Sequence, residues 1–169
     1  MASNNITSYV AATPILLTPN DGERFSIIGG GVRILIDGAS SGGRCCMFEC
    51  PIPPGDGPPL HKHEHEDELF YVLQGKIKFS VDGEIFIGEP GSFACAPRGS
   101  VHSFRNIGAQ TALLLVTCTP SGLEIPFRAV RDPEPGDTRD KLSPEEVMSE
   151  FYKHGITFVG PPLTDEHDE

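Results

Sequence analysis

The chain has 169 residues and a formal net charge of -11 at pH 7, and a surface of this sign repels phosphate backbones, so we expect no nucleic-acid partner. Hydrophobic residues make up 38% of the chain and charged residues 22%, which is typical of one globular domain and excludes a disordered chain. No apolar run approaches the roughly 20 residues that span a bilayer, and residues 1–17 lack the features of a signal peptide, so we expect a cytoplasmic protein without a membrane partner.

Glycines and prolines divide most of the chain into short segments that are typical of β-strands. In Lys76–Asp82 apolar and polar residues alternate, which is the period of a half-buried strand, and Asp82-Gly83 then predicts a two-residue hairpin turn. The predicted strands in chain order are Phe25–Gly29, Val32–Asp37, Arg44–Cys50, Glu68–Gln74, Lys76–Asp82, Glu84–Ile87, Ser92–Ala96, His102–Asn106 and Ala112–Thr119. Strands of this number and length favour a sandwich, a barrel or a jelly roll.

One helix is predicted, close to the C-terminus. Ser143 is its N-cap and Pro144 its first helical residue, Glu146 completes a capping box three residues after the cap, and Gly155 ends the helix. We therefore divide the chain into an N-terminal arm (1–24), a β-domain (25–128) and a C-terminal part made of a linker, the helix and an acidic tail (129–169).

The five cysteines, Cys45, Cys46, Cys50, Cys95 and Cys118, are odd in number and have no CxxC spacing. They lie in apolar stretches, where a free cysteine behaves as a small hydrophobic residue. The cysteines therefore indicate a reduced, intracellular protein.

Three histidines and one glutamate form the group of residues with the clearest chemistry. His61 and His63 lie two residues apart, which directs both imidazoles to one face of an extended strand. Glu68 and His102 each begin a predicted strand after a polar turn. Three imidazoles and one carboxylate are a suitable ligand set for a first-row divalent metal. His65 has the same parity as His63 and competes for the role of ligand on spacing alone.

The spacing around these residues is that of two longer motifs. The first is G-x5-HxH-x4-E-x6-G from Gly55 to Gly75, and the second is G-x5-PxG-x2-H-x3-N from Gly91 to Asn106. With both motifs the sequence resembles the cupin superfamily. The resemblance implies an all-β fold, a double-stranded β-helix (jelly-roll) barrel with a metal inside, here followed by a short C-terminal helix.

The resemblance also assigns the metal ligands and leaves out His65. It implies one divalent transition metal bound by His61, His63, Glu68 and His102. Imidazole and carboxylate ligands suit iron, manganese, nickel, cobalt, copper and zinc alike, so the identity of the ion stays open.

The C-terminal run from His154 to Leu163 is similar to the tails of quercetin dioxygenase-like single-domain cupins. This resemblance implies a metal-dependent dioxygenase, an oxidoreductase acting on a small hydroxylated or enolisable substrate, with Glu68 as a catalytic proton acceptor as well as a ligand. Two alternatives stay open, because the fold does not choose among them. One is a non-oxidative cupin isomerase, lyase or decarboxylase, and the other is a non-catalytic small-molecule-binding cupin.

The strand Glu68–Gln74 is apolar on both faces, which is typical of a strand covered on both sides. Leu69, Tyr71 and Leu73 form one of these faces, and the run Ala112–Val116 is apolar throughout. One small barrel does not cover all of this surface. We therefore expect an isologous homodimer.

Overall fold

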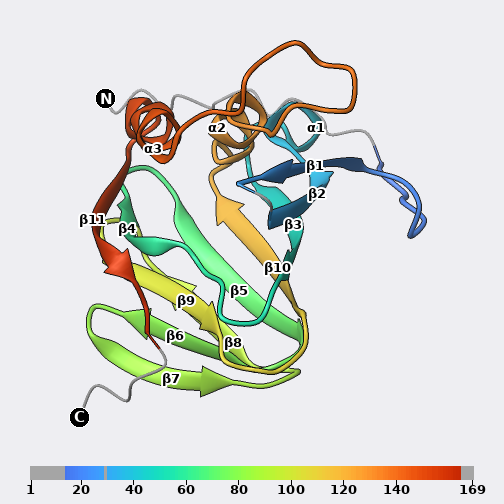
Figure 1. Cartoon of the computed structure of the whole chain (residues 1–169). Coiled ribbons are helices and arrows are strands. Elements are labelled where there is room, and N and C mark those ends of the chain that lie inside the picture. The colour runs from blue at the N-terminus through green and yellow to red at the C-terminus, as the bar shows by residue number, and fades with distance from the viewer. Residues whose placement is uncertain (1–13, 29, 165–169) are drawn as a thin grey trace, which may run out of the picture.

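The structure, a computed structural model, describes residues 14–28 and 30–164, which form two antiparallel β-sheets that face each other (Figure 1). The six-stranded sheet has the order β1 (Glu23–Ile27), β2 (Gly30–Ile36), β3 (Cys46–Ile52), β10 (Ala112–Thr119), β5 (Asp67–Gln74), β8 (Phe93–Ala96). The five-stranded sheet has the order β11 (Ile156–Pro162), β4 (Pro59–His63), β9 (His102–Asn106), β6 (Ile77–Val81), β7 (Glu84–Gly88). The predicted all-β jelly-roll barrel is confirmed.

The β6–β7 hairpin shows how local sequence sets the register of a strand pair. Asp82 and Gly83 have φ values of 49° and 85°, so both central turn residues are left-handed, as a two-residue hairpin requires. The turn pairs Val81 with Glu84 and continues to Ile77 opposite Gly88. The inward-facing residues of β6 thereby reach the core.

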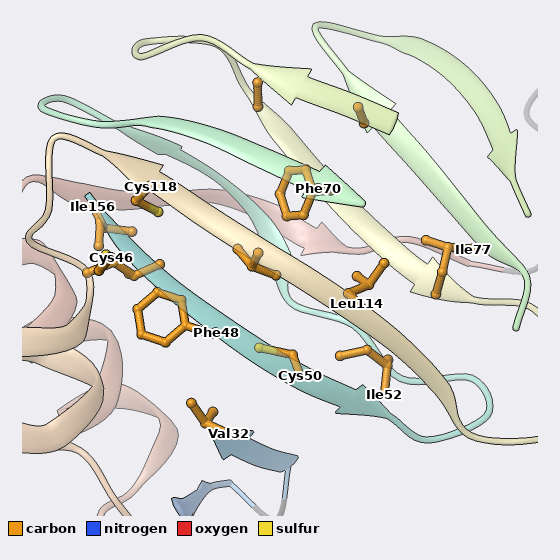
Figure 2. Close-up of a cluster of buried hydrophobic side chains, with 14 of the residues drawn as sticks. Val32, Cys46, Phe48, Cys50, Ile52, Phe70, Ile77, Leu114, Cys118 and Ile156 are labelled. Atoms are coloured by element: carbon orange, nitrogen blue, oxygen red, sulfur yellow. The ribbon is translucent and has the colours of Figure 1, made fainter. Parts of the chain in front are cut away.

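The core lies between the two sheets, where residues of their inner faces pack together, and it extends to buried residues of the helical segments that follow β10 (Figure 2). Phe48 and Leu114 are fully buried on β3 and β10, and Phe70 packs against Phe79 across the barrel with ring centroids 5.6 Å apart. Burying each such side chain stabilises the fold by about 1.5–3 kcal/mol. The outward-facing residues of β5 are much more exposed than these core residues, since Tyr71 is 42% exposed.

The predicted C-terminal helix is present as α3 (Pro144–Lys153). The Ser143 side chain accepts a hydrogen bond from the Glu146 amide, and the Glu146 carboxylate accepts one from the Ser143 amide, which completes the capping box. The buried face of α3 carries Val147 and Phe151. Phe151 packs edge-on against Phe158 of β11, which joins the helix to the five-stranded sheet.

Two further helices, α1 (Gly38–Ser41) and α2 (Glu124–Ala129), were not predicted, so the expectation of one helix was wrong. The N-cap of α2 makes no side-chain hydrogen bond, which leaves the sequence without a local start signal. Tertiary contacts fix α2 instead. The buried Glu124 carboxylate accepts hydrogen bonds from the Gly38 and Gly122 amides, and Phe127 packs on Phe48. The three helices gather at one end of the barrel (Figure 1).

Asn106, the last residue of β9, fixes the end of β3 and the loop after β9 by side-chain hydrogen bonds. Its side-chain amide donates to the carbonyls of Ile52 and Gln110, both at 2.8 Å, and its oxygen accepts from the Gly108 amide at 2.8 Å. Gly75, where β5 turns towards β6, has a φ of 90°, and a Cβ there would lie 2.5 Å from the Ala112 Cβ. Both motif residues therefore hold the ends of the strands that carry the predicted ligands.

Within residues 14–28 and 30–164, none of the helices has the length and apolar character needed to cross a membrane. All five cysteines are free, and Cys46, Cys50 and Cys118 are buried, as a role in packing requires. The acidic tail predicted at residues 165–169 lies outside the described residues.

Candidate metal centre

The structure brings all four predicted ligands together between the sheets. Glu68 extends from β5 of the six-stranded sheet, whereas His61 and His63 come from β4 and His102 from β9 of the five-stranded sheet. All four side chains are buried. Alternation along β4 turns both of its histidines inward and the intervening Lys62 away.

The three imidazoles converge on one carboxylate oxygen. The Oε2 atom of Glu68 lies 2.8 Å from the Nε2 atom of His102, 3.3 Å from that of His63 and 3.9 Å from that of His61. One donor atom from each residue lies within 4.8 Å of those of the other three. Bonds of about 2.0–2.2 Å from a shared ion to nitrogen and oxygen ligands place two ligand atoms at most about 4.4 Å apart, and the three distances from Glu68 lie within that limit. The geometry therefore fits one divalent transition metal.

Hydrogen bonds at the far side of two rings set which nitrogen faces the centre. His61 Nδ1 lies 2.9 Å from the Pro59 carbonyl oxygen, and His102 Nδ1 lies 3.1 Å from that of Ser100. A carbonyl oxygen only accepts, so Nδ1 carries the hydrogen and donates it, and Nε2 of the neutral ring presents its lone pair inward. A lone pair at 2.8 Å from the Glu68 carboxylate needs a proton or a metal ion between the two atoms.

The charges in the cluster suit a metal site. Burial alone raises the pKa of Glu68, but the facing imidazoles of His63, His102 and His61 outweigh it and hold that pKa well below its usual value. Burial lowers the pKa of His61. The centre therefore combines an anionic carboxylate with a neutral imidazole at His61, which are the ligand forms that bind metal.

Glu66 is a buried carboxylate beside the centre that the sequence interpretation missed. It is 4% exposed, and its Oε2 atom lies 3.4 Å from Nδ1 of His63, the ring nitrogen that faces away from Glu68. The polar run 64–67 predicts only a turn, and the one signal for Glu66 in it is a carboxylate three residues after a predicted ligand. Burial alone would lower the pKa of His63, but the carboxylates of Glu68 and Glu66 together outweigh it and raise that pKa.

His65, the competing ligand on spacing, lies outside the cluster. The strand β4 ends at His63, so the alternation that would turn His65 inward stops there. The His65 side chain is exposed, and its ring lies 2.7 Å from the place where a Cβ on Gly155 would be.

A cavity of about 420 Å³ opens beside His61, His63 and Glu68. Both sheets, the helices α2 and α3, and the loop before β4 form its wall. The wall is mostly apolar, and four of its residues are the phenylalanines Phe104, Phe127, Phe151 and Phe158. Among the described residues, no lysine or arginine lines it. A larger groove of about 850 Å³ lies elsewhere, between residues 15–19 and the six-stranded sheet, and contains none of the four ligands.

Cys50 is one of the residues that line the cavity. Burial, followed by the negative charges of Glu68 and Glu49, raises the pKa of the Cys50 thiol to about 12. The thiol is therefore neutral at ordinary pH. Since metals bind cysteine as the thiolate, Cys50 adds an apolar surface rather than a fifth ligand.

Comparison with known proteins agrees with this geometry. Residues 48–118 match the family described as Cupin domain. The chain is 27% identical over 156 residues to quercetin 2,3-dioxygenase of Bacillus subtilis (strain 168), an alignment that covers 90% of this chain and 45% of that protein. The chain thus spans about half the length of this curated relative.

Two solved structures show the same fold. A structure of KdgF from Halomonas sp. superposes with a TM-score of 0.58 at 18% identity, covering 67% of this chain and 99% of that one. A predicted oxalate decarboxylase from Thermotoga maritima superposes with a TM-score of 0.52 at 28% identity, covering 58% of this chain and 90% of that one. By fold, by motif and by family match, residues 48–118 of this chain form a cupin domain.

Proposed function

We propose that the protein is a metal-dependent dioxygenase that acts on a neutral, largely apolar small molecule with one hydroxyl or enol group. The observation that carries the proposal is the juxtaposition of a three-histidine, one-glutamate cluster with a phenylalanine-lined cavity that has no lysine or arginine among its described lining residues. The volume of about 420 Å³ falls in the range of about 300–1,000 Å³ that is usual for small-molecule sites.

His61, His63, Glu68 and His102 would hold the metal. A bound divalent ion supplies Lewis acidity, which lowers the pKa of a substrate hydroxyl and favours reaction with dioxygen. Glu68 is anionic and adjoins the cavity, so it is placed to accept the hydroxyl proton. The apolar wall excludes water and orients the rest of the substrate.

The chemistry of the cavity wall separates this proposal from the alternatives. A carboxylate or phosphate substrate would have to enter an apolar space whose described lining offers no cationic side chain to pair with it. A decarboxylase of small acids or an isomerase of sugar phosphates is therefore less well supported. A non-catalytic binding cupin would use the same cavity, and turnover distinguishes it.

The test is oxygen uptake by purified protein loaded in turn with each candidate divalent metal. We expect uptake with a flavonol or a β-diketone and none with oxalate or a sugar phosphate. In a dioxygenase both atoms of ¹⁸O₂ enter the product and the substrate is the source of all electrons, so no reductant is added. Conversion of a substrate without oxygen uptake would establish the non-oxidative alternative, and tight binding without conversion would establish the binding cupin.

We also propose that two copies assemble through the outer face of the six-stranded sheet. Tyr71 is the register partner of both Phe93 and Leu115, and Tyr71, Leu73 and Phe93 are 42%, 40% and 58% exposed. An apolar sheet face of this kind is the usual feature of a protein interface.

The five free thiols support the expected cytoplasmic location, since thiols stay reduced there.

A further inference from the structure

The three imidazoles of the centre differ in what their outward nitrogens face. His61 and His102 donate from Nδ1 to backbone carbonyl oxygens, of Pro59 and Ser100. His63 instead faces the carboxylate of Glu66. One of the three predicted histidine ligands is therefore paired with a negative charge and the other two with neutral acceptors.

The two facing atoms are both left unsatisfied. Nδ1 of His63 and Oε2 of Glu66 are buried, lie 3.4 Å apart and make no hydrogen bond within the described part of the chain. A buried carboxylate oxygen that accepts no hydrogen bond is rare, because removing it from water is costly and no bond offsets the cost. A small closure between these two atoms would satisfy both of them.

Three contacts of the surrounding chain set the positions of Glu66 and His63. Arg98 donates to the neighbouring Asp67 from its amide, Nε and Nη2 at 2.9–3.0 Å, which fixes the bend after Glu66. The Gly99 amide donates to the His63 carbonyl at 2.7 Å. Gly122 backs the carboxylate itself, since a Cβ on Gly122 would lie 2.4 Å from Oε1 of Glu66. The position of the carboxylate depends on this glycine.

We propose that Glu66 is a positioning residue for the metal centre. It accepts a hydrogen bond from Nδ1 of His63, which keeps the ring hydrogen on that nitrogen, directs the Nε2 lone pair to the metal and makes His63 the strongest donor of the three imidazoles. The inference rests on the metal binding in the proposed function and is independent of the substrate and of the reaction.

The experiment compares Glu66→Leu, which removes the acceptor, with Glu66→Gln, which keeps an acceptor oxygen but no charge. Glu64→Leu is the matched control, because Glu64 is an exposed glutamate in the same bend. The probe is Zn²⁺ alone, titrated into chelator-treated protein in competition with a chelating dye. In the Zn²⁺-loaded, ¹⁵N-histidine-labelled protein, the Nδ1 proton resonances report the hydrogen bonds directly.

We expect Glu66→Leu to weaken Zn²⁺ binding by about 10–100-fold, the usual effect of losing such a partner, with a smaller loss in Glu66→Gln and no change in Glu64→Leu. The wild type should show three downfield Nδ1 protons, with that of His63 farthest downfield, and Glu66→Leu should lose this one alone. Unchanged affinity together with an unchanged His63 resonance would overturn the inference.

Gly122→Ala provides a second route that leaves Glu66 in the chain. Its Cβ would displace the carboxylate, so Zn²⁺ affinity and the His63 resonance should change in the same direction as in Glu66→Leu. If Glu66→Leu does not fold, the Zn²⁺ affinity and the His63 resonance of Gly122→Ala test the role of Glu66 instead. Normal Zn²⁺ binding in the wild type without oxygen uptake on any substrate would defeat the proposed dioxygenase and leave the role of Glu66 standing. Wild-type protein that binds no Zn²⁺ would overturn both.

Discussion

His61 and His102 are direct cross-strand partners on β4 and β9, and their ring centroids lie 4.4 Å apart. The backbone pairing of two adjacent strands therefore places two of the four predicted ligands. Glu68 reaches the same point from the opposite sheet, where it is the register partner of Ala96 and Cys118. Ligands supplied by rigid strands of both sheets give a site whose geometry is set by the barrel itself.

Substituting either partner tests the metal assignment. We expect His61→Ala and His102→Ala to fold cooperatively but to lose most of their bound metal, because each removes one inward-facing Nε2 atom from a cluster of four donors. Elemental analysis of protein purified without chelators gives the stoichiometry. His65→Ala is the control and should retain its metal, since the His65 ring lies outside the cluster and is exposed. Full metal content in both cluster variants would disprove the assignment.

The clustering of the four candidate ligands and most of the strands were predictable because their signals are local. A period of two along β6 and the Asp82-Gly83 turn specify a hairpin whatever surrounds it, and the structure has that hairpin. The two motifs specify the four candidate ligands by spacing, and all four lie on strands in the structure. The capping box of α3 is equally local.

The features that were missed depend on contacts between distant segments. The helix α2 is held by Glu124 against Gly38 and by Phe127 against Phe48, and neither contact leaves a mark in the sequence around residues 124–129. Glu66 lies among charged residues that are typical of a solvated turn, whereas in the structure it is buried, with Gly122 of a distant segment close to its carboxylate. The phenylalanine wall of the cavity was not predictable for the same reason, because it forms only when α2, α3 and β11 pack over the barrel.

Asp37 is expected to stabilise the fold in a pH-dependent way. Its side chain caps α1 by accepting from the Ser40 amide at 2.9 Å, and it pairs with Arg128 at 2.8 Å. The Ser40 hydrogen bonds, followed by those with Arg128, outweigh partial burial and lower the pKa of Asp37 to about 2. Asp37→Ala should cost about 1–2 kcal/mol of unfolding free energy at pH 7, the usual cost of losing an N-cap.

The sign of the pH effect follows from the lowered pKa of Asp37. A carboxylate with a depressed pKa contributes stability above its ordinary pKa of about 4 and loses it as the pH falls through the folded value of about 2. Urea unfolding of wild type and Asp37→Ala should therefore differ at pH 7 and converge towards pH 2. A difference that stays constant over this range would show that the charge of Asp37 is not involved.

The proposed dimer predicts a change of mass on substitution of its apolar face. Phe93→Glu places a charge opposite Tyr71, and desolvating it in an interface is costly, so the variant should become monomeric. Light scattering of the wild type at micromolar concentration should give twice the 18.2 kDa of one chain. Tyr152→Glu, at an exposed position of α3, is the control and should remain dimeric. A wild-type mass near that of one chain would count decisively against the interface.

Glu68→Gln separates the two roles proposed for Glu68. The amide keeps the shape of the side chain and an oxygen for the metal, but it loses the negative charge and nearly all of its basicity. If Glu68 accepts the substrate proton, turnover per bound metal should fall by about 10²–10⁴-fold, the usual contribution of a positioned base. Metal content should fall much less, because the three imidazoles remain.

The measurement takes metal content and oxygen uptake from the same preparation of Glu68→Gln, so that activity is expressed per bound ion. The imidazoles that hold the pKa of Glu68 low also make it a weak base, which limits the driving force for proton transfer. If Glu68 acts only as a ligand, the Glu68→Gln variant should lose metal and activity in proportion, and its activity per bound ion should match that of the wild type. That result would remove the proton step from the proposed mechanism while leaving the metal centre intact.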